Sequence, residues 1–312
     1  MKRVLITGAS GFVGGLLVQR LRDAGYALNL AGRAAKAAPD GNVRYFAVGE
    51  IGLQTDWRPA LEDCDAVVHL AALVHRPDAA EQDYDAVNNL GTARLAELMA
   101  KGSPKVLIFL SSLAAVSDNL AAKPVDENTV AEPVTPYGRS KLAAEKHVSM
   151  FSQAEGIGIS LRPPIVYGPN APANWRQLQR LAATGLPLPF GAVNNRRSLL
   201  SVENLVDALI HLLELPADRM QSGNYLIADN EVVSLTQIMT WLRSGMGIRR
   251  RLVSVPDKLL RHSLAMVGKG KMAHSLLDNL EVNSTRFRET FGWSPKINTR
   301  DGITQSGAGF QR

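Results

Sequence analysis

Cysteine and long apolar runs are the scarcest features of this 312-residue sequence. The single cysteine, Cys64, cannot form an internal disulfide, and no Cys/His cluster has the spacing of metal ligands, so we expect a reducing, cytoplasmic setting and no bound metal. No stretch of about 18 uninterrupted apolar residues occurs, which argues against a membrane-spanning helix. The basic, apolar start of the chain is similar to a signal peptide, but TGASG interrupts it and fits a strand, a turn and a helix better.

Composition and charge exclude further classes of protein. With 46% hydrophobic and 21% charged residues, the chain can bury a large core, so a predominantly disordered protein is excluded. The formal net charge of +6 suits an anionic partner, but we find no nucleic-acid motif and no basic stripe with interleaved aromatic residues. In the basic runs at 249–251 and 258–271, a basic surface helix is favoured over a membrane-surface contact.

Short β-branched runs alternate with amphipathic segments along the first half of the chain. This alternation predicts a parallel sheet covered on both faces by helices, the doubly wound α/β architecture of the Rossmann type. We assign residues 1–165 to this domain and most of 166–312 to a smaller C-terminal domain, with a segment near 198–229 returning to the main sheet. The expected strands are 4–8, 26–32, 43–49, 65–72, 105–112 and 158–164, and the expected helices are 12–24, 84–101 and 136–153.

Three glycines follow the first expected strand at three-residue intervals. Gly8 would form a tight turn, Gly11 would let a pyrophosphate approach the backbone, and Gly14 would let the helix pack closely on the strand. A glycine triplet alone is weak evidence. Its position between a strand and a helix favours a dinucleotide-binding turn over a merely structural one.

The stretch YGRSK places a phenol and an ammonium on one face of a helix. Tyr137 and Lys141 are separated by one helical turn, so their side chains are neighbours. Moving the pKa of a tyrosine from about 10 toward 7 requires about 4 kcal/mol of differential stabilisation, and a nearby lysine is the right kind of source. The alternative interpretation is an ordinary exposed helix face.

Two serines close the fifth expected strand. A hydroxyl at the carboxyl edge of a parallel sheet can polarise a substrate carbonyl or support proton transfer by a tyrosine. Ser112 is our first choice for this role and Ser111 is the second. A serine at the end of a strand is also a common turn former.

Six motifs occur along the chain in the order TGASGFVG, VVHLAA, NNLGT, FLSS, YGRSK and LRPPIVYGP. Together they resemble the extended short-chain dehydrogenase/reductase family over essentially the whole chain. The resemblance implies Tyr137 as general acid and base, Lys141 as the residue that binds the nicotinamide ribose and lowers the tyrosine pKa, and Asn88 as a structural or proton-relay residue. The catalytic set is then Ser112, Tyr137 and Lys141. The cofactor-binding set is Gly8, Ser10, Gly11, Phe12, Val13, Gly14, Arg33, Glu50, Ile51, Leu70, Ala71, Ala72, Asn88, Tyr137, Lys141 and Pro164.

The second half is similar to nucleotide-sugar epimerases and reductases, and in particular to bacterial enzymes that reduce a UDP-4-keto-6-deoxy-N-acetylhexosamine. Arg197 falls on an arginine that clamps the nucleotide diphosphate in this family, and Asn174 falls on an asparagine that contacts the same group. With His75 and Ser112 these residues form the expected substrate-binding set. A second arginine that UDP-galactose 4-epimerases use has no clear equivalent in LLDNLEVNSTRF. For the Arg196–Arg197 pair, a solvated basic loop is the alternative.

The residue after the second expected strand bears on the reaction. NAD-using epimerases of the family carry an aspartate there, which would repel a 2′-phosphate, whereas this chain has Gly32 followed by Arg33. We therefore expect NADP(H) in preference to NAD, and NADPH-dependent reduction at C4 of a UDP-linked 4-keto-6-deoxy sugar. A UDP-hexose 4-epimerase with tightly bound NAD is the first alternative, and a ketoreductase of a non-nucleotide substrate is the second. The intact triad argues against a protein that only senses NADP(H). By the same resemblance we expect a homodimer.

Overall fold

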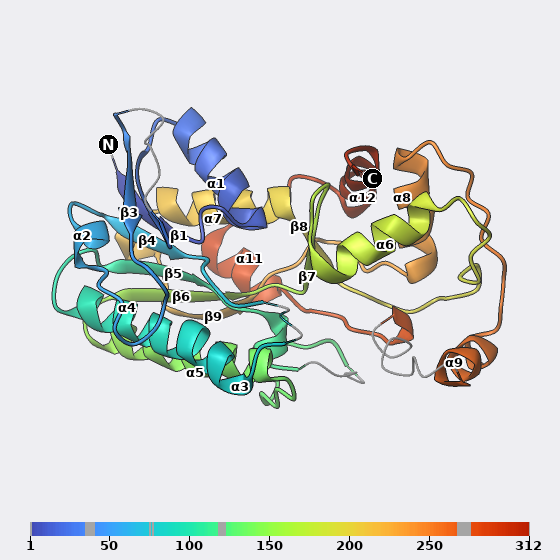
Figure 1. Cartoon of the computed structure of the whole chain (residues 1–312), viewed down its shortest axis with the longest axis horizontal. Coiled ribbons are helices and arrows are strands. Elements are labelled where there is room, and N and C mark those ends of the chain that lie inside the picture. The colour runs from blue at the N-terminus through green and yellow to red at the C-terminus, as the bar shows by residue number, and fades with distance from the viewer. Residues whose placement is uncertain are drawn as a thin grey trace.

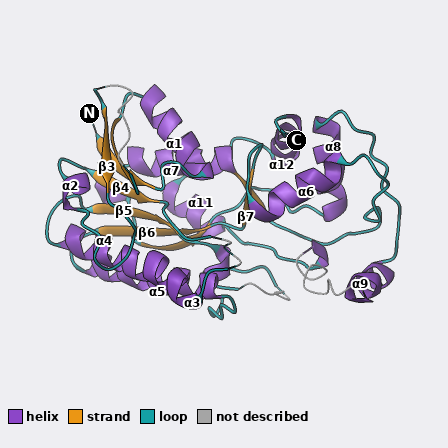
Figure 2. Ribbon diagram, viewed as in Figure 1, coloured by secondary structure: helices purple, strands orange, loops and turns teal. Residues whose placement is uncertain are grey.

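The computed structural model describes residues 2–34, 41–74, 76, 78–117, 123–266 and 276–311. Strands and helices alternate through the first half of this part of the chain (Figure 2). The strands are β1 Arg3–Thr7, β2 Ala27–Gly32, β3 Val43–Ala47, β4 Ala66–His69, β5 Val106–Leu110, β6 Ile157–Arg162, β7 Ile165–Tyr167, β8 Leu199–Ser201 and β9 Gly223–Leu226. The helices of the first half are α1 Phe12–Asp23, α2 Arg58–Leu61, α3 Glu81–Tyr84, α4 Gly91–Ala100 and α5 Pro136–Gln153. Those of the second half are α6 Ala173–Ala183, α7 Val202–Glu214, α8 Leu235–Gly245, α9 Asp257–Met266, α11 Thr285–Phe291 and α12 Thr299–Ala308.

The main sheet has seven parallel strands in the order β3-β2-β1-β4-β5-β6-β9. The chain proceeds outward from β1 in one direction, and then from β4 in the other, so the order reverses between β1 and β4. Ligands of open α/β sheets bind at this reversal, outside the carboxyl ends of the strands. The predicted doubly wound Rossmann architecture is confirmed.

Helices cover both faces of the sheet (Figure 1). On one face, α1, α7 and α11 bury apolar residues against β1, β2, β4 and β6 in one core cluster, which includes Leu17, Leu209 and Phe287. On the other face, α2, α4 and α5 bury a second cluster against β1, β4 and β5. Because both faces are covered, the central strands read as nearly continuous apolar runs rather than as alternating ones.

Most of the second half forms a smaller lobe with its own core, built on α6, α8, α12 and the two-stranded parallel sheet of β7 and β8. Phe12, at the start of α1, packs against this core, so the two lobes touch beside the first glycine-rich turn. Within the segment 198–229, β8 pairs with β7 in the small sheet, α7 packs against α1, and β9 enters the main sheet beside β6. The division of the chain after residue 165 stays a prediction.

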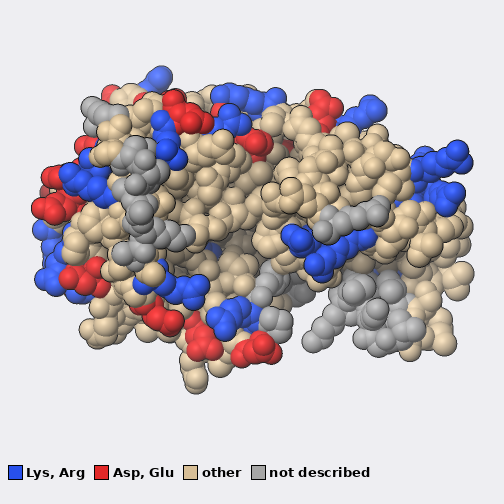
Figure 3. All heavy atoms as spheres, turned by 45° about the horizontal axis from the view of Figure 1, so that its top comes forward, with Lys and Arg blue, Asp and Glu red and all other residues tan. Residues whose placement is uncertain are grey.

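The described part of the chain meets neither the requirements for a membrane-spanning helix nor those for a metal site of three His, Cys, Asp or Glu side chains. Across the described ranges, no helix has both the length and the apolar character to cross a bilayer. The same residues hold no group of three His, Cys, Asp or Glu that could bind a metal ion. On the face shown in Figure 3, Lys and Arg are interleaved with Asp and Glu over the larger lobe rather than gathered in one stripe.

Candidate active site

The glycine-rich turn between β1 and α1 is packed too closely for side chains. Gly8 has a left-handed φ of 71°, and a Cβ there would lie 2.7 Å from the backbone nitrogen of Ala71. A Cβ on Gly14 would lie 2.2 Å from the carbonyl oxygen of Gly8. The turn is therefore pressed between the first turn of α1 and the chain that leaves β4, where the predicted residues Leu70 and Ala71 lie.

The amino end of α1 suits an anionic ligand. Gly11 is the N-cap, it offers no side chain to the helix amides, and the first turn contains no acidic residue. Ser10 and Gly11 are exposed, while Phe12 and Val13 are half-buried. Free amides and the positive end of the helix dipole favour a phosphate at such a position. These features fit the pyrophosphate of a dinucleotide.

We expect Gly14→Ala to weaken dinucleotide binding at least tenfold and to destabilise the fold, because the new methyl group overlaps the backbone of Gly8. The matched control is Gly15→Ala. The nearest atom to a Cβ at Gly15 is 4.0 Å away, and alanine is favoured over glycine inside a helix by about 1 kcal/mol. Thermal unfolding with and without dinucleotide measures both effects. Equal behaviour of the two variants would contradict the close packing of this turn.

The first turn of α5 carries Tyr137. Thr135 caps the helix by accepting a hydrogen bond from the Gly138 amide at 3.1 Å, and Pro136 occupies the first position, as is typical of a helix start. A Cβ on Gly138 would lie 2.3 Å from the carbonyl oxygen of Ala114. The absence of a side chain at Gly138 thus lets the Tyr137 turn lie directly against the chain that follows Ser112.

Lys141 lies one turn further along α5 and is almost completely buried. Its Nζ donates to the carbonyl oxygen of Leu110 at 2.6 Å and lies 4.4 Å from the ring centroid of Phe109. Burial lowers the pKa of Lys141 to about 7, and the negative charge of Glu145 opposes that shift. The ammonium is held beside the carboxyl end of β5, and its role next to Tyr137 stays a prediction.

The two serines after β5 have different surroundings. Ser111 is buried, and its hydroxyl donates to Oε1 of Glu145 at 2.5 Å, inside the protein. Ser112 is half-buried, and its Oγ accepts from the Ala114 amide at 3.1 Å, which caps a short 3-10 turn. This difference favours Ser112 as the hydroxyl near the reacting group, and its catalytic role stays a prediction.

Asn88 ties the loop after β4 to α5. It is buried in a π-helical turn, Asp85–Leu90, which joins α3 to α4. Its amide accepts from the Leu73 amide at 2.7 Å, and donates to the Leu73 carbonyl at 3.1 Å and to Ser140 Oγ at 2.9 Å. These contacts agree with the structural alternative for Asn88. A direct contact between Asn88 and the cofactor stays a prediction.

His69, at the end of β4, is completely buried and fully hydrogen-bonded. The Thr92 hydroxyl donates to the carbonyl oxygen of Asn88 at 2.6 Å. Its oxygen therefore accepts a hydrogen bond from Nε2 of His69 at 3.1 Å. Nδ1 is therefore unprotonated and accepts from the Thr7 hydroxyl at 2.7 Å. Burial lowers the pKa of His69 to about 3. The imidazole is a neutral connector between β1 and α4.

We expect His69 to make the fold sensitive to acid. The unfolded chain takes up a proton near pH 6.5 and the folded chain only near 3, so the free energy of unfolding falls as the pH falls between these values. Between pH 7 and 5 this histidine should account for a loss of about 2 kcal/mol. Urea unfolding at both pH values should show a smaller loss in His69→Gln. The exposed His262→Gln is the control, and an unchanged loss in His69→Gln would contradict the expectation.

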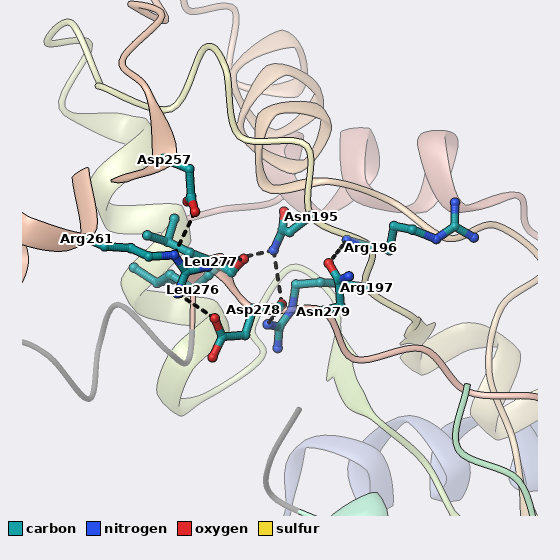
Figure 4. A network of polar contacts seen from close by, with 9 residues as sticks. All are labelled: Asn195, Arg196, Arg197, Asp257, Arg261, Leu276, Leu277, Asp278 and Asn279. Carbon is teal, nitrogen blue, oxygen red and sulfur yellow. Dashed lines mark hydrogen bonds and ion pairs between the residues drawn. The ribbon is translucent and has the colours of Figure 1, made fainter. Parts of the chain in front are cut away.

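Arg197 is buried beside Asp278 in the smaller lobe (Figure 4). Its Nη1 donates to the carbonyl oxygen of Asp278 at 3.0 Å, and burial lowers its pKa while Asp278 opposes the shift. The Asp278 carboxylate binds Arg261 at 2.6 Å. Arg196, in contrast, is exposed and pairs with Glu281. Arg196 is therefore a solvent-exposed loop residue, whereas Arg197 is not. The contact of Arg197 with a diphosphate stays a prediction.

The other predicted site residues differ in how far they are exposed to solvent. Arg33 and Glu50 are exposed, and Asn174 is exposed in the first turn of α6. Ile51 is half-buried, and it lies against α4, because a Cβ on Gly91 would approach its Cγ2 to 2.4 Å. Ala72 is half-buried and Pro164 is buried. His75 lies outside the described residues.

Sequence reasoning missed two features near Tyr137. The ring centroid of Tyr84 lies 6.4 Å from that of Tyr137, and the Tyr84 hydroxyl bonds the backbone of Arg76 at 3.1 Å. Glu145 and Arg162 form a buried ion pair beneath α5. Glu145 follows Lys141 by four residues, and this helical spacing could have predicted that the two side chains share a face of α5.

The parallel sheet with its reversal of strand order, and the close-packed glycine turn at that reversal, define a Rossmann-fold protein with room for a dinucleotide at the amino end of α1. Residues 4–228 match the model of the NAD dependent epimerase/dehydratase family. The chain belongs to this family.

Individual relatives agree over nearly the full length. The chain is 32% identical to a UDP-glucose 4-epimerase of Vibrio cholerae, over 99% of this chain and 95% of the relative. It is 27% identical to a UDP-glucose 4-epimerase of Mycolicibacterium smegmatis, over 97% of each chain. A solved structure of UDP-N-acetylglucosamine 4-epimerase from Bacillus cereus has a TM-score of 0.77 at 21% identity and covers 98% of both chains. That last likeness supports the fold.

Proposed function

We propose that this protein is a UDP-hexose 4-epimerase that holds NAD through the catalytic cycle. The observation that carries the proposal is the 32% identity to a UDP-glucose 4-epimerase that spans nearly all of both chains. The comparisons favour this reaction over the C4 ketoreduction that the sequence led us to expect first. The glycine-rich turn and the open amino end of α1 would hold the pyrophosphate of the dinucleotide.

In this proposal Tyr137 exchanges a proton with the oxygen on C4 of the sugar. When bound, NAD would supply an acceptor that takes a hydride from C4 and returns it to the opposite face. Tyr137 takes the hydroxyl proton during oxidation and gives it back during reduction. Lys141 favours the phenolate through its positive charge, and Ser112 donates a hydrogen bond to the same oxygen.

The smaller lobe would hold the nucleotide part of the substrate. Arg197 is the proposed contact to the diphosphate, because a guanidinium is a planar fork of donors that suits two phosphate oxygens. Asn174, exposed in the first turn of α6, would supply a further contact. With the sugar end at Tyr137, the substrate would lie across both lobes.

The proposal is tested by turnover without added cofactor. Purified protein is incubated with UDP-glucose alone and the products are separated by ion-exchange chromatography, which should show UDP-galactose. The nucleotide released by denaturing the protein should be NAD. No interconversion in protein that carries stoichiometric NAD would refute the epimerase proposal.

One observation favours reduction instead. Gly32 ends β2 without an acid, and Arg33 is exposed beside it, so a 2′-phosphate would meet no repulsion and could pair with Arg33. If the protein is a reductase, Arg33→Asp should lower the affinity for NADPH relative to NADH. An unchanged preference would remove this candidate. A thermal shift with UDP would argue against a ketoreductase of a non-nucleotide substrate.

We also propose that the protein forms a homodimer in the cytoplasm. The support is the family resemblance, in which helices that correspond to α4 and α5 pair between subunits. Met150, on α5, is 61% exposed and would be covered in such a dimer. Light scattering on the purified protein gives the mass directly, and a monomer would contradict the proposal.

A further inference from the structure

A buried ion pair lies directly beneath the proposed catalytic helix. Glu145 and Arg162 have side-chain exposures of 2% and 7% and meet through two contacts, Nη2–Oε2 at 2.6 Å and Nε–Oε1 at 2.9 Å. The Ser111 hydroxyl donates a third hydrogen bond to Oε1 at 2.5 Å. The carboxylate is thus held in place by three donors and is shielded from solvent.

The position of this pair links it to the site. Glu145 lies one helical turn after Lys141 and two turns after Tyr137 on α5. Arg162 is the last residue of β6, and Ser111 directly follows β5. The pair therefore joins α5 to the carboxyl ends of two neighbouring strands, next to Ser112.

Stability alone is a poor explanation for such a pair. Removing two charges from water costs about as much as their attraction returns, and apolar residues of similar volume often stabilise a core equally well. A buried carboxylate does something that an apolar side chain cannot do, which is to place a negative charge at a fixed point. The nearest candidate to feel that charge is the buried ammonium of Lys141.

The surroundings of Lys141 leave its charge dependent on Glu145. The ammonium has the Leu110 carbonyl and the Phe109 ring as partners, and burial lowers its pKa to about 7. The charged groups that act on one another here are Glu145, which acts on Lys141, and Lys141, which acts on the neutral His69 on β4. Tyr137 precedes Lys141 by one turn on α5, and Arg162 on β6 pairs with Glu145. Of these, Glu145 raises the pKa of Lys141.

We infer that Glu145, held by Ser111 and Arg162, is a positioning residue that keeps Lys141 charged and so sets the ionisation of Tyr137. The inference rests on the roles proposed above for Tyr137 and Lys141. It makes Glu145 act through Lys141 rather than on the substrate. A residue that only held α5 in place would not change the proton affinity of Tyr137 in a folded protein.

The test measures the ionisation of Tyr137 by the ultraviolet absorbance of its phenolate. Each titration is repeated in a Tyr137→Phe background, and the difference isolates the one phenol. Glu145→Gln should raise the pKa of Tyr137 by about half a unit or more, and Lys141→Met sets the full size of the effect. Ser111→Ala is the matched control, because it removes a hydrogen bond to the carboxylate and leaves every charge in place.

The outcomes separate cleanly. A rise in Glu145→Gln that is absent in Ser111→Ala supports the inference, whereas no rise, or an equal rise in both variants, overturns it. If circular dichroism shows that Glu145→Gln does not fold, Glu145→Asp is used instead. It shortens the side chain by one methylene, moves the carboxylate away from Lys141 and should raise the pKa of Tyr137 by a smaller amount. No rise in that variant also overturns the inference.

The same data distinguish this inference from the proposed function. The titration needs neither substrate nor turnover. A protein without epimerase activity whose Tyr137 pKa rises in Glu145→Gln would refute the function and keep the link between Glu145, Lys141 and Tyr137. An active epimerase with an unchanged Tyr137 pKa would keep the function and refute the link.

Discussion

Tyr137→Phe is expected to lower kcat for the interconversion of UDP-glucose and UDP-galactose by about 10²- to 10⁴-fold, because it removes the group that moves the proton at C4. The change deletes one oxygen from a half-buried ring, so the fold and the dinucleotide should be retained. The measurement is kcat by product chromatography, together with the amount of dinucleotide that co-purifies. Full activity in this variant would remove the proposed mechanism.

Tyr84→Phe is the matched control for this prediction. The change is chemically identical, and the ring centroid lies 6.4 Å from that of Tyr137. The Tyr84 hydroxyl, however, bonds the backbone of Arg76 and so supports the loop after β4. We expect at most a tenfold effect, seen mainly in KM. A loss as large as that of Tyr137→Phe would move the proton transfer away from Tyr137 or make Tyr84 part of it.

Arg162→Met is expected to lower the free energy of unfolding by about 3–5 kcal/mol, because it leaves the buried carboxylate of Glu145 without its charged partner. Such a loss is a large part of the total stability of a typical domain, about 5–15 kcal/mol. Urea unfolding followed by circular dichroism measures it.

Arg20→Met is the matched control for the ion pair. Arg20 makes an equally short contact with Glu203, 2.7 Å, but the two side chains are 53% and 35% exposed. Water screens such a pair, so its loss should cost about 0–1 kcal/mol. Similar losses in the two variants would show that the environment of the Glu145–Arg162 pair is less dry than its burial indicates.

The sequence alone determined the elements that rest on local signals. Helix α5 begins at Pro136 and ends at Gln153, as expected, because Thr135 and Pro136 are strong start signals. The first strand and the first helix also lie where their composition and glycines place them. The placement of Tyr137 and Lys141 one turn apart on α5 follows in the same way, since a four-residue spacing on a helix fixes which residues share a face.

Only the tertiary structure decided which groups meet across elements. It placed Ser111 on Glu145 and left Ser112 at the edge of the sheet, although the two serines are equivalent as neighbours in the sequence. It buried Arg197 while Arg196 stayed exposed, and it brought Glu145 to Arg162 and Asn88 to Ser140. Such contacts depend on the packing of α5 against β5 and β6, and on the order of the strands. Spacing along the chain carries no record of these long-range distances, whereas helix starts, turns and faces are fixed within a few residues.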